Sequence, residues 1–348
     1  MTSWGMRDAA VTLSMTKGEM TRVYQFNQVG PSNVLVLREA SVSAPRHGEV
    51  QIRTKALGLN RAEIMYRTGQ YVIDPVFPAT LGYEAAGVVE AVGPGVKEFQ
   101  VGDAVSVVPA FSFADYGMYG ELVNAPQHAV VKHPLNLSFE EAAASWMMYI
   151  TAYGALIELG SLQAGDYVLI RGASSSVGLA AIQVANMVGA IPIALTRGSD
   201  KRSALLRAGA AHVIATEESD VVEEVLRVTG GAGARIAFDP VGGSGATSLL
   251  KVLSMNGIFF QYGALDAGDI AVPVMDLLGK HLTLRGYELF EITLEPSRLE
   301  RAKQFVSAGL SSGRLRPVID RVFEFEDMAA AHHYMEANGQ VGKIVVRV

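Results

Sequence analysis

The stretch that most constrains the fold of this chain is residues 166–190, DYVLIRGASSSVGLAAIQVANMVGA. Within it, residues 167–170 form a short apolar run rich in β-formers, which predicts a buried parallel strand. A turn of small residues follows over 172–176, and a helix is predicted from Val177 onward. In such a strand–turn–helix unit, backbone N–H groups at the helix start face a phosphate, and small residues let it approach. The stretch therefore predicts a binding site for a dinucleotide.

The glycine pattern of that site is degraded. Ala173, Ser175 and Gly178 stand at the three glycine positions of G-x-G-x-x-G. Small residues still permit close approach, and the hydroxyls of residues 174–176, Ser176 among them, can cap the helix or hydrogen-bond a phosphate. From this stretch alone, the alternative is an ordinary serine-capped helix of an α/β domain.

The segments that follow favour the dinucleotide site. Further strand-like runs occur at residues 191–195, 212–215, 235–238 and 257–261, and helical patterns occur at 201–208 and 221–228. Strands and helices that alternate at this spacing specify a doubly wound parallel sheet of the Rossmann kind. The expected fold class is therefore α/β, with the phosphate turn after the first strand of the sheet.

The end of the second strand indicates which dinucleotide binds. An NAD site has an acidic side chain about 20 residues past the glycine turn, where it accepts a hydrogen bond from the ribose 2′-hydroxyl. This chain has Thr196 and Arg197 there instead, with Lys201 close behind. A guanidinium attracts a 2′-phosphate and can bind it through two parallel N–H bonds. NADP(H) is therefore the predicted cofactor. The alternative is that Arg197 and Lys201 only form the solvated start of a helix.

Composition excludes several classes of protein. The chain has 348 residues, enough for two domains, and its 49% hydrophobic and 18% charged residues are typical of a globular protein. Its net charge of −6 provides no basic field for nucleic acid, and no apolar run is long enough to predict a membrane span. There is no cysteine, which rules out disulfides and thiolate zinc ligands. A cytoplasmic location is the default expectation.

The flanking segments predict a second, β-rich domain. Short β-like runs at residues 50–56, 85–92 and 104–108 are separated by glycine and proline turns, as in a compact, partly closed barrel. Ser138 and Glu141 have capping-box spacing and predict a helix near the domain boundary. The terminal strand, 343–348, has no partner nearby in sequence, so we expect it to return to the β-domain. The expected layout is a loosely ordered extension at 1–20, a discontinuous β-domain over 21–145 and 289–348, and a dinucleotide-binding domain over 146–288.

This order of domains resembles the medium-chain dehydrogenase/reductase superfamily. The resemblance is carried by residues 58–63 (GLNRAE), 81–87 (LGYEAAG), 142–156 and 165–183. It implies a GroES-like β-barrel catalytic domain beside the Rossmann domain. The chain looks most similar to the zinc-independent quinone oxidoreductase branch, which includes zeta-crystallin. The zinc ligands of other members, two cysteines and a histidine, match Asn60, Tyr83 and Met147 here. Amide, phenol and thioether groups bind Zn²⁺ poorly, so no metal is expected.

The resemblance also implies a set of site residues. Asn60 would stand at the start of a short helix and Tyr71 in the loop after it, where enoyl thioester reductases of the superfamily have a proton-donating tyrosine. The alternative is that Asn60 only caps the helix and the Tyr71 hydroxyl faces water. The cofactor contacts implied by position are Thr151, Ser175, Ser176, Val177, Thr196, Arg197, Lys201, Tyr262, Gly263, Leu289, Phe290 and Lys343. Gly263, Leu289 and Phe290 would flank the nicotinamide. Lys343 would approach the phosphates, and the alternative is that it has a structural role in the terminal strand.

Three functions fit these features. The first is an NADPH-dependent reductase that transfers hydride, without a metal, to quinones or α,β-unsaturated carbonyls, in which the developing charge is delocalised onto an oxygen. The second is an enoyl thioester reductase, which should have a long acyl channel and depend on Tyr71. The third is a non-catalytic NADPH-binding protein, either crystallin-like or a sensor. A homodimer is expected, because related proteins usually pair through the edge of the dinucleotide sheet.

Overall fold

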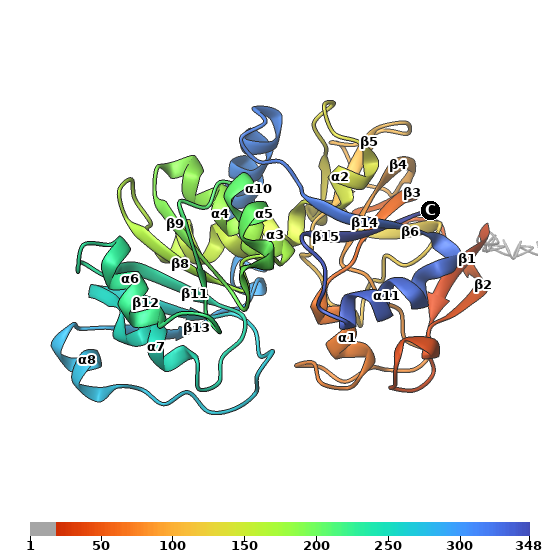
Figure 1. Cartoon of the computed structure of the whole chain (residues 1–348). Helices are drawn as coiled ribbons and strands as arrows, with labels where there is room; N and C mark the ends of the chain where they lie inside the picture. The colour runs from red at the N-terminus through yellow and green to blue at the C-terminus, as the bar shows by residue number, and fades with distance from the viewer. Residues whose placement is uncertain (1–18) are drawn as a thin grey trace, which may run out of the picture.

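The middle of the chain folds as its alternating pattern predicts. In the computed structural model, which describes residues 19–348, six strands form one sheet in the order β10-β9-β8-β11-β12-β13 (Figure 1). These strands are β8 (Tyr167–Arg171), β9 (Ile191–Thr196), β10 (His212–Ala215), β11 (Ala234–Asp239), β12 (Leu253–Gln261) and β13 (Thr283–Gly286). Every neighbouring pair is parallel, which confirms the doubly wound sheet. The strand order reverses between β8 and β11, and such sheets bind ligands at that point, beyond the carboxyl ends of the strands.

Both faces of this sheet are buried. Along β8, Val168 and Ile170 belong to one apolar cluster and Leu169 to another, because successive side chains of a strand point to opposite faces. The helices that follow the strands are α4 (Ser176–Val188), α5 (Arg202–Arg207), α6 (Val221–Val228), α7 (Ala246–Lys251) and α8 (Val274–Gly279), with a short 3-10 turn η4 (Ser199–Lys201) before α5. A continuous helix was expected over 201–208, but the structure has η4 and α5 there.

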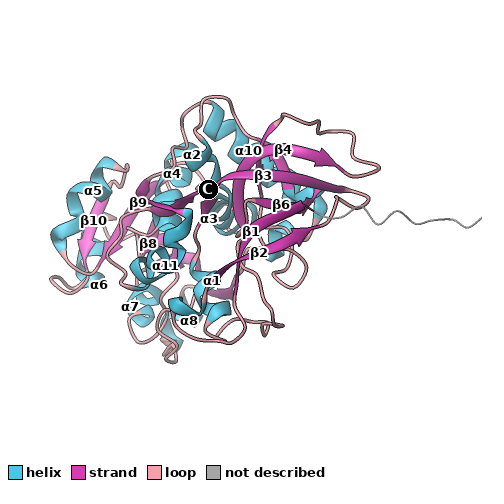
Figure 2. Cartoon of the chain, turned by 90° about the vertical axis from the view of Figure 1, so that its right-hand side faces the viewer, coloured by secondary structure: helices cyan, strands magenta, loops and turns pink. Residues whose placement is uncertain are grey.

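A second sheet of seven strands forms the β-domain. Its order is β14-β15-β3-β4-β5-β7, with β6 also paired to β3. The strands are β3 (Glu49–Gly58), β4 (Glu84–Val92), β5 (Ala104–Val107), β6 (Leu122–Pro126), β7 (Val130–Lys132), β14 (Ile319–Glu324) and β15 (Lys343–Arg347). The predicted return of the terminal strand is confirmed, since β15 pairs antiparallel with β3, Val345 opposite Gly58. The antiparallel pair β1 (Glu19–Gln25) and β2 (Val36–Val42) lies beside β6 (Figure 2).

The start of β1 corrects one expected boundary. Residues 1–18 of the predicted extension lie outside the described residues, but Glu19 and Met20 already form the first two residues of β1. Both pair with β2, Glu19 opposite Val42 and Met20 opposite Ser41. The β-domain therefore begins at least two residues earlier than its predicted start at residue 21.

Helices join the two domains. The predicted capping box opens α2 (Phe139–Ala143): the Glu141 N–H donates to Ser138 Oγ at 3.2 Å, and the Ser138 N–H donates to Glu141 Oε2 at 2.8 Å. The next helix, α3 (Trp146–Tyr153), continues as a π-helix over Gly154–Leu159. The remaining helical segments are α1 (Arg61–Arg67), α9 (Phe290–Thr293), α10 (Pro296–Ser311), α11 (Met328–Glu336), η1 (Ser32–Val34), η2 (Gln127–Ala129) and η5 (Phe325–Asp327).

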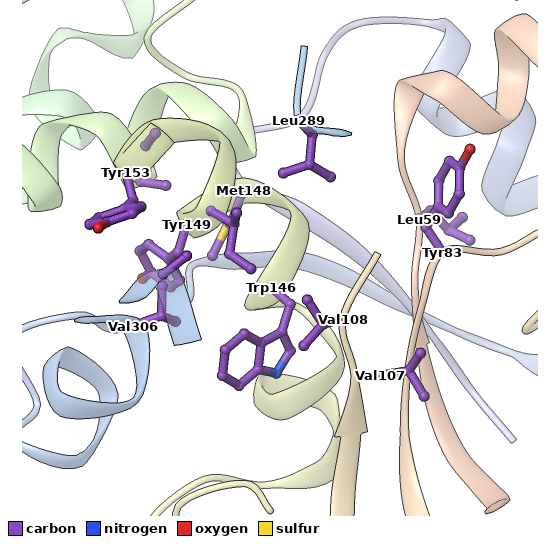
Figure 3. Close-up of a cluster of buried hydrophobic side chains, with 14 of the residues drawn as sticks. Leu59, Tyr83, Val107, Val108, Trp146, Met148, Tyr149, Tyr153, Leu289 and Val306 are labelled. Carbon is purple, nitrogen blue, oxygen red and sulfur yellow. The ribbon is translucent and has the colours of Figure 1, made fainter. Parts of the chain in front are cut away.

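The side chains of α3 fill the space between the domains. Figure 3 shows Trp146 near Val108 of the β-domain, and Tyr149 near Val306 of α10. These residues belong to one buried apolar cluster that extends through both domains. The shared core fixes how the domains sit relative to each other and therefore fixes the geometry of any site between them. Within residues 19–348, no helix has both the length and the apolar character needed to cross a bilayer.

Candidate functional site

The predicted phosphate turn lies where β8 meets α4. Gly172 has a φ of +61°, a conformation that favours glycine, and the chain then turns into the helix. Ser175 is the N-cap of α4, because its Oγ accepts a hydrogen bond from the Gly178 N–H at 3.1 Å. A Cβ on Gly178 would lie 2.6 Å from the Ala173 carbonyl oxygen, so this glycine is required for the turn to pack on the helix. Ser176 and Val177 form the first turn of α4, and their backbone N–H groups point out of the helix start.

The C-terminal segment of the β-domain reaches this turn. The Gly342 N–H donates to the Ser174 carbonyl oxygen at 3.0 Å. Lys201 Nζ lies 3.5 Å from Ser174 Oγ and 3.4 Å from the Gln340 carbonyl oxygen. The structure therefore places Lys201 beside the phosphate turn and at the contact between the two domains.

The two predicted cationic residues, Arg197 and Lys201, follow the end of β9, and the acidic residue Glu218 lies nearby. Thr196 is buried and Arg197 is exposed at the end of the strand. Glu218, from the loop after β10, accepts a hydrogen bond from the Ser199 N–H at 2.7 Å. The sequence analysis missed Glu218 because it lies about 20 residues further on and carries no motif of its own. The corner thus holds the cations of Arg197 and Lys201 together with the carboxylates of Asp200 and Glu218, which both lie close to Gly198.

Two buried polar atoms on this side of the sheet fit a ligand. Within residues 19–348, Tyr262 Oη and Gln340 Oε1 are buried and have no hydrogen-bond partner. Tyr262 follows β12 and its ring stacks on Phe238, with 3.9 Å between centroids, while Gln340 lies beside Lys201. At Gly263, a Cβ would come within 2.7 Å of the Pro240 carbonyl oxygen, so the backbone here packs closely. Because unpartnered buried polar groups are rare, these atoms fit a bound dinucleotide.

Aromatic side chains surround the predicted position of the reacting acceptor. Tyr83 is buried and stacks on Phe113 with 3.7 Å between ring centroids, and Phe290 packs edge-on against Tyr83 at 5.5 Å. Tyr71 is half-buried, and its Oη lies 3.4 Å from Tyr83 Oη. Burial raises the pKa of the Tyr71 hydroxyl and that of the Tyr83 hydroxyl, so both stay protonated and can donate. The structure therefore brings together Tyr71 and Phe290 through Tyr83.

Asn60 occupies the predicted helix start, but its side chain bonds elsewhere. It is the N-cap of α1, and its Nδ2 donates to the Gly58 carbonyl oxygen at 3.1 Å and to Glu84 Oε2 at 3.0 Å. Its Oδ1 accepts a hydrogen bond from Lys343 Nζ at 2.6 Å. An amide has two N–H donors, so both are already used inside the protein. Asn60 therefore lies at the site with no free donor for a substrate.

Lys343 lies in a different place from the one that the resemblance implied. Its side chain is 1% exposed and forms an ion pair with the fully buried Glu84. The contact with the phosphate turn comes from its neighbour Gly342, whose backbone N–H donates to the Ser174 carbonyl oxygen. Glu84 Oε1 also accepts from the Met147 N–H at 2.7 Å. The Lys343 ammonium thus lies among residues 60, 84 and 147.

The buried side chain of Glu63 forms hydrogen bonds that connect Asn60, Tyr83 and Tyr119. Glu63 accepts hydrogen bonds from the Asn60 N–H at 2.7 Å, the Tyr83 N–H at 3.1 Å and the Tyr119 hydroxyl at 2.6 Å. Tyr119 Oη is also 2.9 Å from His332 Nε2. Burial raises the pKa of Glu63 to about 7, and burial lowers that of His332 to about 3. Sequence reasoning missed this group because its members come from four distant segments of the chain.

The remaining predicted contacts lie within α3 and just before α9. Thr151 is buried, and its Oγ1 donates to the Met147 carbonyl oxygen at 2.5 Å within α3. Leu289 is buried just before α9, and Figure 3 shows its side chain near Met148 of the same helix α3.

Comparison with known proteins defines the class. Residues 46–135 match the alcohol dehydrogenase GroES-like domain, and residues 176–308 match the zinc-binding dehydrogenase family. Human quinone oxidoreductase is 32% identical over 327 residues, covering 93% of this chain and 96% of the relative. The rat synaptic vesicle membrane protein VAT-1 homolog is 32% identical over 325 residues, covering 89% of this chain and 79% of the relative. The fold and these matches together make the chain a member of the medium-chain dehydrogenase/reductase superfamily.

Solved structures place the chain more narrowly. Escherichia coli quinone oxidoreductase, crystallised with NADPH, superposes with a TM-score of 0.84 at 28% identity, covering 94% of this chain and all of that one. The CurK enoyl reductase superposes equally well, with a TM-score of 0.84 at 26% identity, covering 94% and 99%. The protein belongs to the quinone oxidoreductase branch of the superfamily, and the GroES-like and Rossmann architecture expected from its sequence is confirmed.

The zinc implied by one family description does not fit this chain. The positions that match zinc ligands hold Asn60, Tyr83 and Met147, and an ammonium group, that of Lys343, bonds to the Asn60 oxygen. A cation there would repel a metal ion. Over the described residues, 19–348, no group of three or more His, Cys, Asp or Glu side chains is arranged to hold a metal. We therefore derive no step through zinc.

Proposed function

We propose that this protein is an NADPH-dependent oxidoreductase that delivers hydride to a quinone or an α,β-unsaturated carbonyl without a metal ion. One observation carries the proposal: the hydroxyl of Tyr83, a residue that matches a zinc-ligand position of relatives, lies 3.4 Å from the hydroxyl of Tyr71, and both rings pack among aromatic side chains. Such a surface suits a flat, apolar, electron-poor acceptor. The E. coli quinone oxidoreductase complexed with NADPH supports the choice of cofactor.

This chain's residues would hold the cofactor as follows. The N–H groups of Ser176 and Val177 at the start of α4 face the pyrophosphate. Arg197 and Lys201 hold the 2′-phosphate, and Gly263 with Phe290 flanks the nicotinamide. NADPH supplies the hydride when bound. Thr151 and Leu289, at α3 and before α9, line the space between these points.

The proton comes from a tyrosine in this proposal. Hydride addition to the acceptor leaves negative charge on its oxygen, which a donor held in place stabilises. The Tyr71 side chain is half-buried and its hydroxyl is protonated. The Tyr83 hydroxyl can donate a hydrogen bond to Tyr71 Oη when Tyr71 gives its own proton to the acceptor. Both amide N–H groups of Asn60 already donate to Gly58 and Glu84. We therefore propose that Asn60 positions neighbouring residues of the site and does not donate to the substrate.

Tyr71→Phe is expected to lower kcat about tenfold to a hundredfold with a smaller change in KM, because it removes the positioned proton donor of the reaction. Steady-state kinetics with a fixed acceptor measures both constants. The matched control is Tyr116→Phe, since Tyr116 donates to Glu49 on another part of the β-domain and should not affect turnover. An unchanged kcat in Tyr71→Phe would mean that solvent, and not Tyr71, protonates the anion that hydride addition leaves.

The function is tested by a panel of acceptors with NADPH: quinones, enals and enoyl thioesters. The proposal expects NADPH oxidation with quinones or enals. Highest kcat/KM with an enoyl thioester would favour the second candidate, which the similarity to CurK enoyl reductase and the position of Tyr71 support. Tight NADPH binding with no turnover of any acceptor would instead indicate a non-catalytic binding protein.

The proposal includes a homodimer formed through the edge strand β13, which is last in the sheet order. Nearby side chains are apolar and exposed: Leu284 is 41% exposed and Met275 of α8 is 79% exposed. We expect wild-type protein to have twice the chain mass by light scattering, and Leu284→Arg to have the mass of one chain. Leu206→Arg, on α5 near the opposite edge, should remain dimeric. A wild-type monomer would contradict this part of the proposal.

We also propose that the protein is located in the cytoplasm, which is the default expectation from its sequence.

A further inference from the structure

We propose that Lys343 is a positioning residue for the hydride-transfer step, and that its buried ammonium holds the acceptor side of the site in place. This inference rests on the proposed function and goes beyond it. The resemblance implied that Lys343 approaches the phosphates. The structure instead puts its charge at Asn60 and Glu84, away from the turn that binds them.

The burial of this ion pair is the first argument. The Lys343 side chain is 1% exposed and that of Glu84 is 0% exposed, so neither charge is hydrated. Removing two charges from water is costly, and a hydrophobic pair of similar size is often as stable. Stability alone therefore gives little reason for this pair to lie in the core. Its hydrogen bond to Asn60, and the position of Glu84 next to Tyr83 in the chain, connect the pair to the proposed acceptor site.

The second argument is the number of segments that the pair joins. Lys343 begins β15, Glu84 begins β4, and Asn60 precedes α1. Lys343 Nζ donates to Asn60 Oδ1 at 2.6 Å, and Glu84 Oε1 accepts from the Met147 N–H of α3 at 2.7 Å. One buried network thus fixes four segments that meet at the site.

The third argument links this network to Tyr83 and Tyr71. Tyr83 immediately precedes Glu84, so fixing Glu84 also fixes the backbone that carries the Tyr83 ring. The Tyr83 hydroxyl lies 3.4 Å from that of Tyr71. A small displacement of groups that position a reaction can lower its rate about a hundredfold. The position of the Tyr71–Tyr83 pair therefore depends on the buried ion pair.

Charge provides the fourth argument. Negative charge develops on the acceptor oxygen during hydride transfer, and an uncompensated carboxylate nearby would oppose it. Lys343 neutralises Glu84, which is held within the same network. Gly342, the preceding residue, bonds to Ser174 in the phosphate turn, so the network begins one residue away from the cofactor site. Lys343 is therefore placed where the cofactor half and the acceptor half of the site meet.

The test compares Lys343→Met with the double variant Lys343→Met/Glu84→Gln, which leaves no unpaired charge. Three quantities are measured for each: the melting temperature, the dissociation constant of NADPH, and the single-turnover rate of hydride transfer to a quinone at saturating NADPH. Lys201→Met is the contrasting variant, because Lys201 lies at the phosphate turn and should mainly affect NADPH affinity. Lys132→Met, at an exposed lysine that pairs with Asp103, is the neutral control.

Lys343→Met is expected to lower the melting temperature and to slow hydride transfer at least about tenfold, with a change in NADPH dissociation constant of less than about threefold. The double variant should regain the melting temperature and the part of the rate that the unpaired Glu84 charge costs, but it should remain several-fold slower than wild type because the ion pair that positions Tyr83 is absent. Recovery of both would overturn the inference, because the pair would then only balance charge. An unchanged rate at saturation with NADPH binding weakened tenfold or more would also overturn it, and would make Lys343 a phosphate ligand.

Failure of the proposed function has a separate signature, which is a wild-type protein that turns over no acceptor. In that case the fluorescence of bound NADPH provides the test, because its emission responds to the surroundings of the nicotinamide. The inference expects the double variant to shift this emission while Lys132→Met does not. Identical emission in wild type and double variant would overturn the inference.

Discussion

Replacing Arg197 by glutamate is expected to weaken NADPH binding about a hundredfold, while NADH binding changes little. A hydrogen bond between charged groups contributes about 1.5–3 kcal/mol, and the new carboxylate adds repulsion toward the 2′-phosphate. Each 1.4 kcal/mol is roughly a factor of ten in affinity. Arg197 is exposed at the end of β9, so the substitution should leave the fold intact. Fluorescence titration with each cofactor measures both dissociation constants.

A substitution of Glu218 is the matched comparison, because it should change NADPH affinity in the opposite direction from Arg197→Glu. Its carboxylate holds the Ser199 N–H at 2.7 Å, beside the same corner. Glu218→Gln removes a negative charge near the 2′-phosphate and should therefore tighten NADPH binding a few-fold. If wild-type protein bound NADH and NADPH equally well, or if Arg197→Glu left NADPH affinity unchanged, the assignment of this corner to the 2′-phosphate would be wrong.

The second large effect is on stability and concerns Glu63. Burial raises the pKa of this carboxyl from 4.5 to about 7 on folding. Between these values the folded chain holds a proton that the unfolded chain has lost, so the free energy of unfolding falls as pH rises from 4.5 to 7. The loss is on the order of 3 kcal/mol. In Glu63→Gln this contribution to the pH dependence should disappear.

Denaturant unfolding at several pH values measures this effect as the difference between wild type and variant. The difference is needed because His332, whose pKa burial lowers to about 3, makes stability rise with pH over an overlapping range. Tyr119→Phe is the comparison variant, since it removes a donor to Glu63 that lowers its pKa and should therefore extend the fall in stability to higher pH. The same slope in wild type and Glu63→Gln would show that Glu63 is ionised throughout.

Much of the dinucleotide domain could be predicted from the sequence because its signals are local. The runs at 167–170 and 191–195 correspond to β8 and β9, and the pattern at 221–228 matches α6. Strands buried on both faces show as continuous apolar runs, and helices show their own period. In contrast, β14 was not predicted: its sequence, IDRVFE, is half charged and partly exposed, so it lacks a strand pattern.

The site was harder to predict because it is assembled from distant segments. The turn residues Ser175 and Gly178 lie where the motif puts them. The buried network around Glu63 and Lys343 joins residues more than 200 positions apart in the chain, as between Asn60 and Lys343. No spacing rule connects such residues. Their partners are set by the antiparallel pairing of β15 with β3, which only the folded chain shows.

The chemistry of the acceptor site follows from side-chain identity more than from the fold. Asn60, Tyr83 and Met147 share a framework with metal-binding relatives but supply amide, phenol and thioether groups. The structure adds a fully buried ion pair and two tyrosine hydroxyls at the same point. In the function proposed above, this arrangement orients and protonates the acceptor.

The most direct test of metal-free hydride transfer uses NADPH labelled with deuterium at the transferable C4 position and an α,β-unsaturated ketone, with protein shown by elemental analysis to contain no bound metal. The hydride forms a C–H bond at the β-carbon while the alkene π-bond breaks, and a proton completes the saturated ketone. The account predicts one deuterium retained at the β-carbon of each product molecule, at a rate unaffected by chelators. An unlabelled product, or activity that requires one zinc ion per chain, would contradict it.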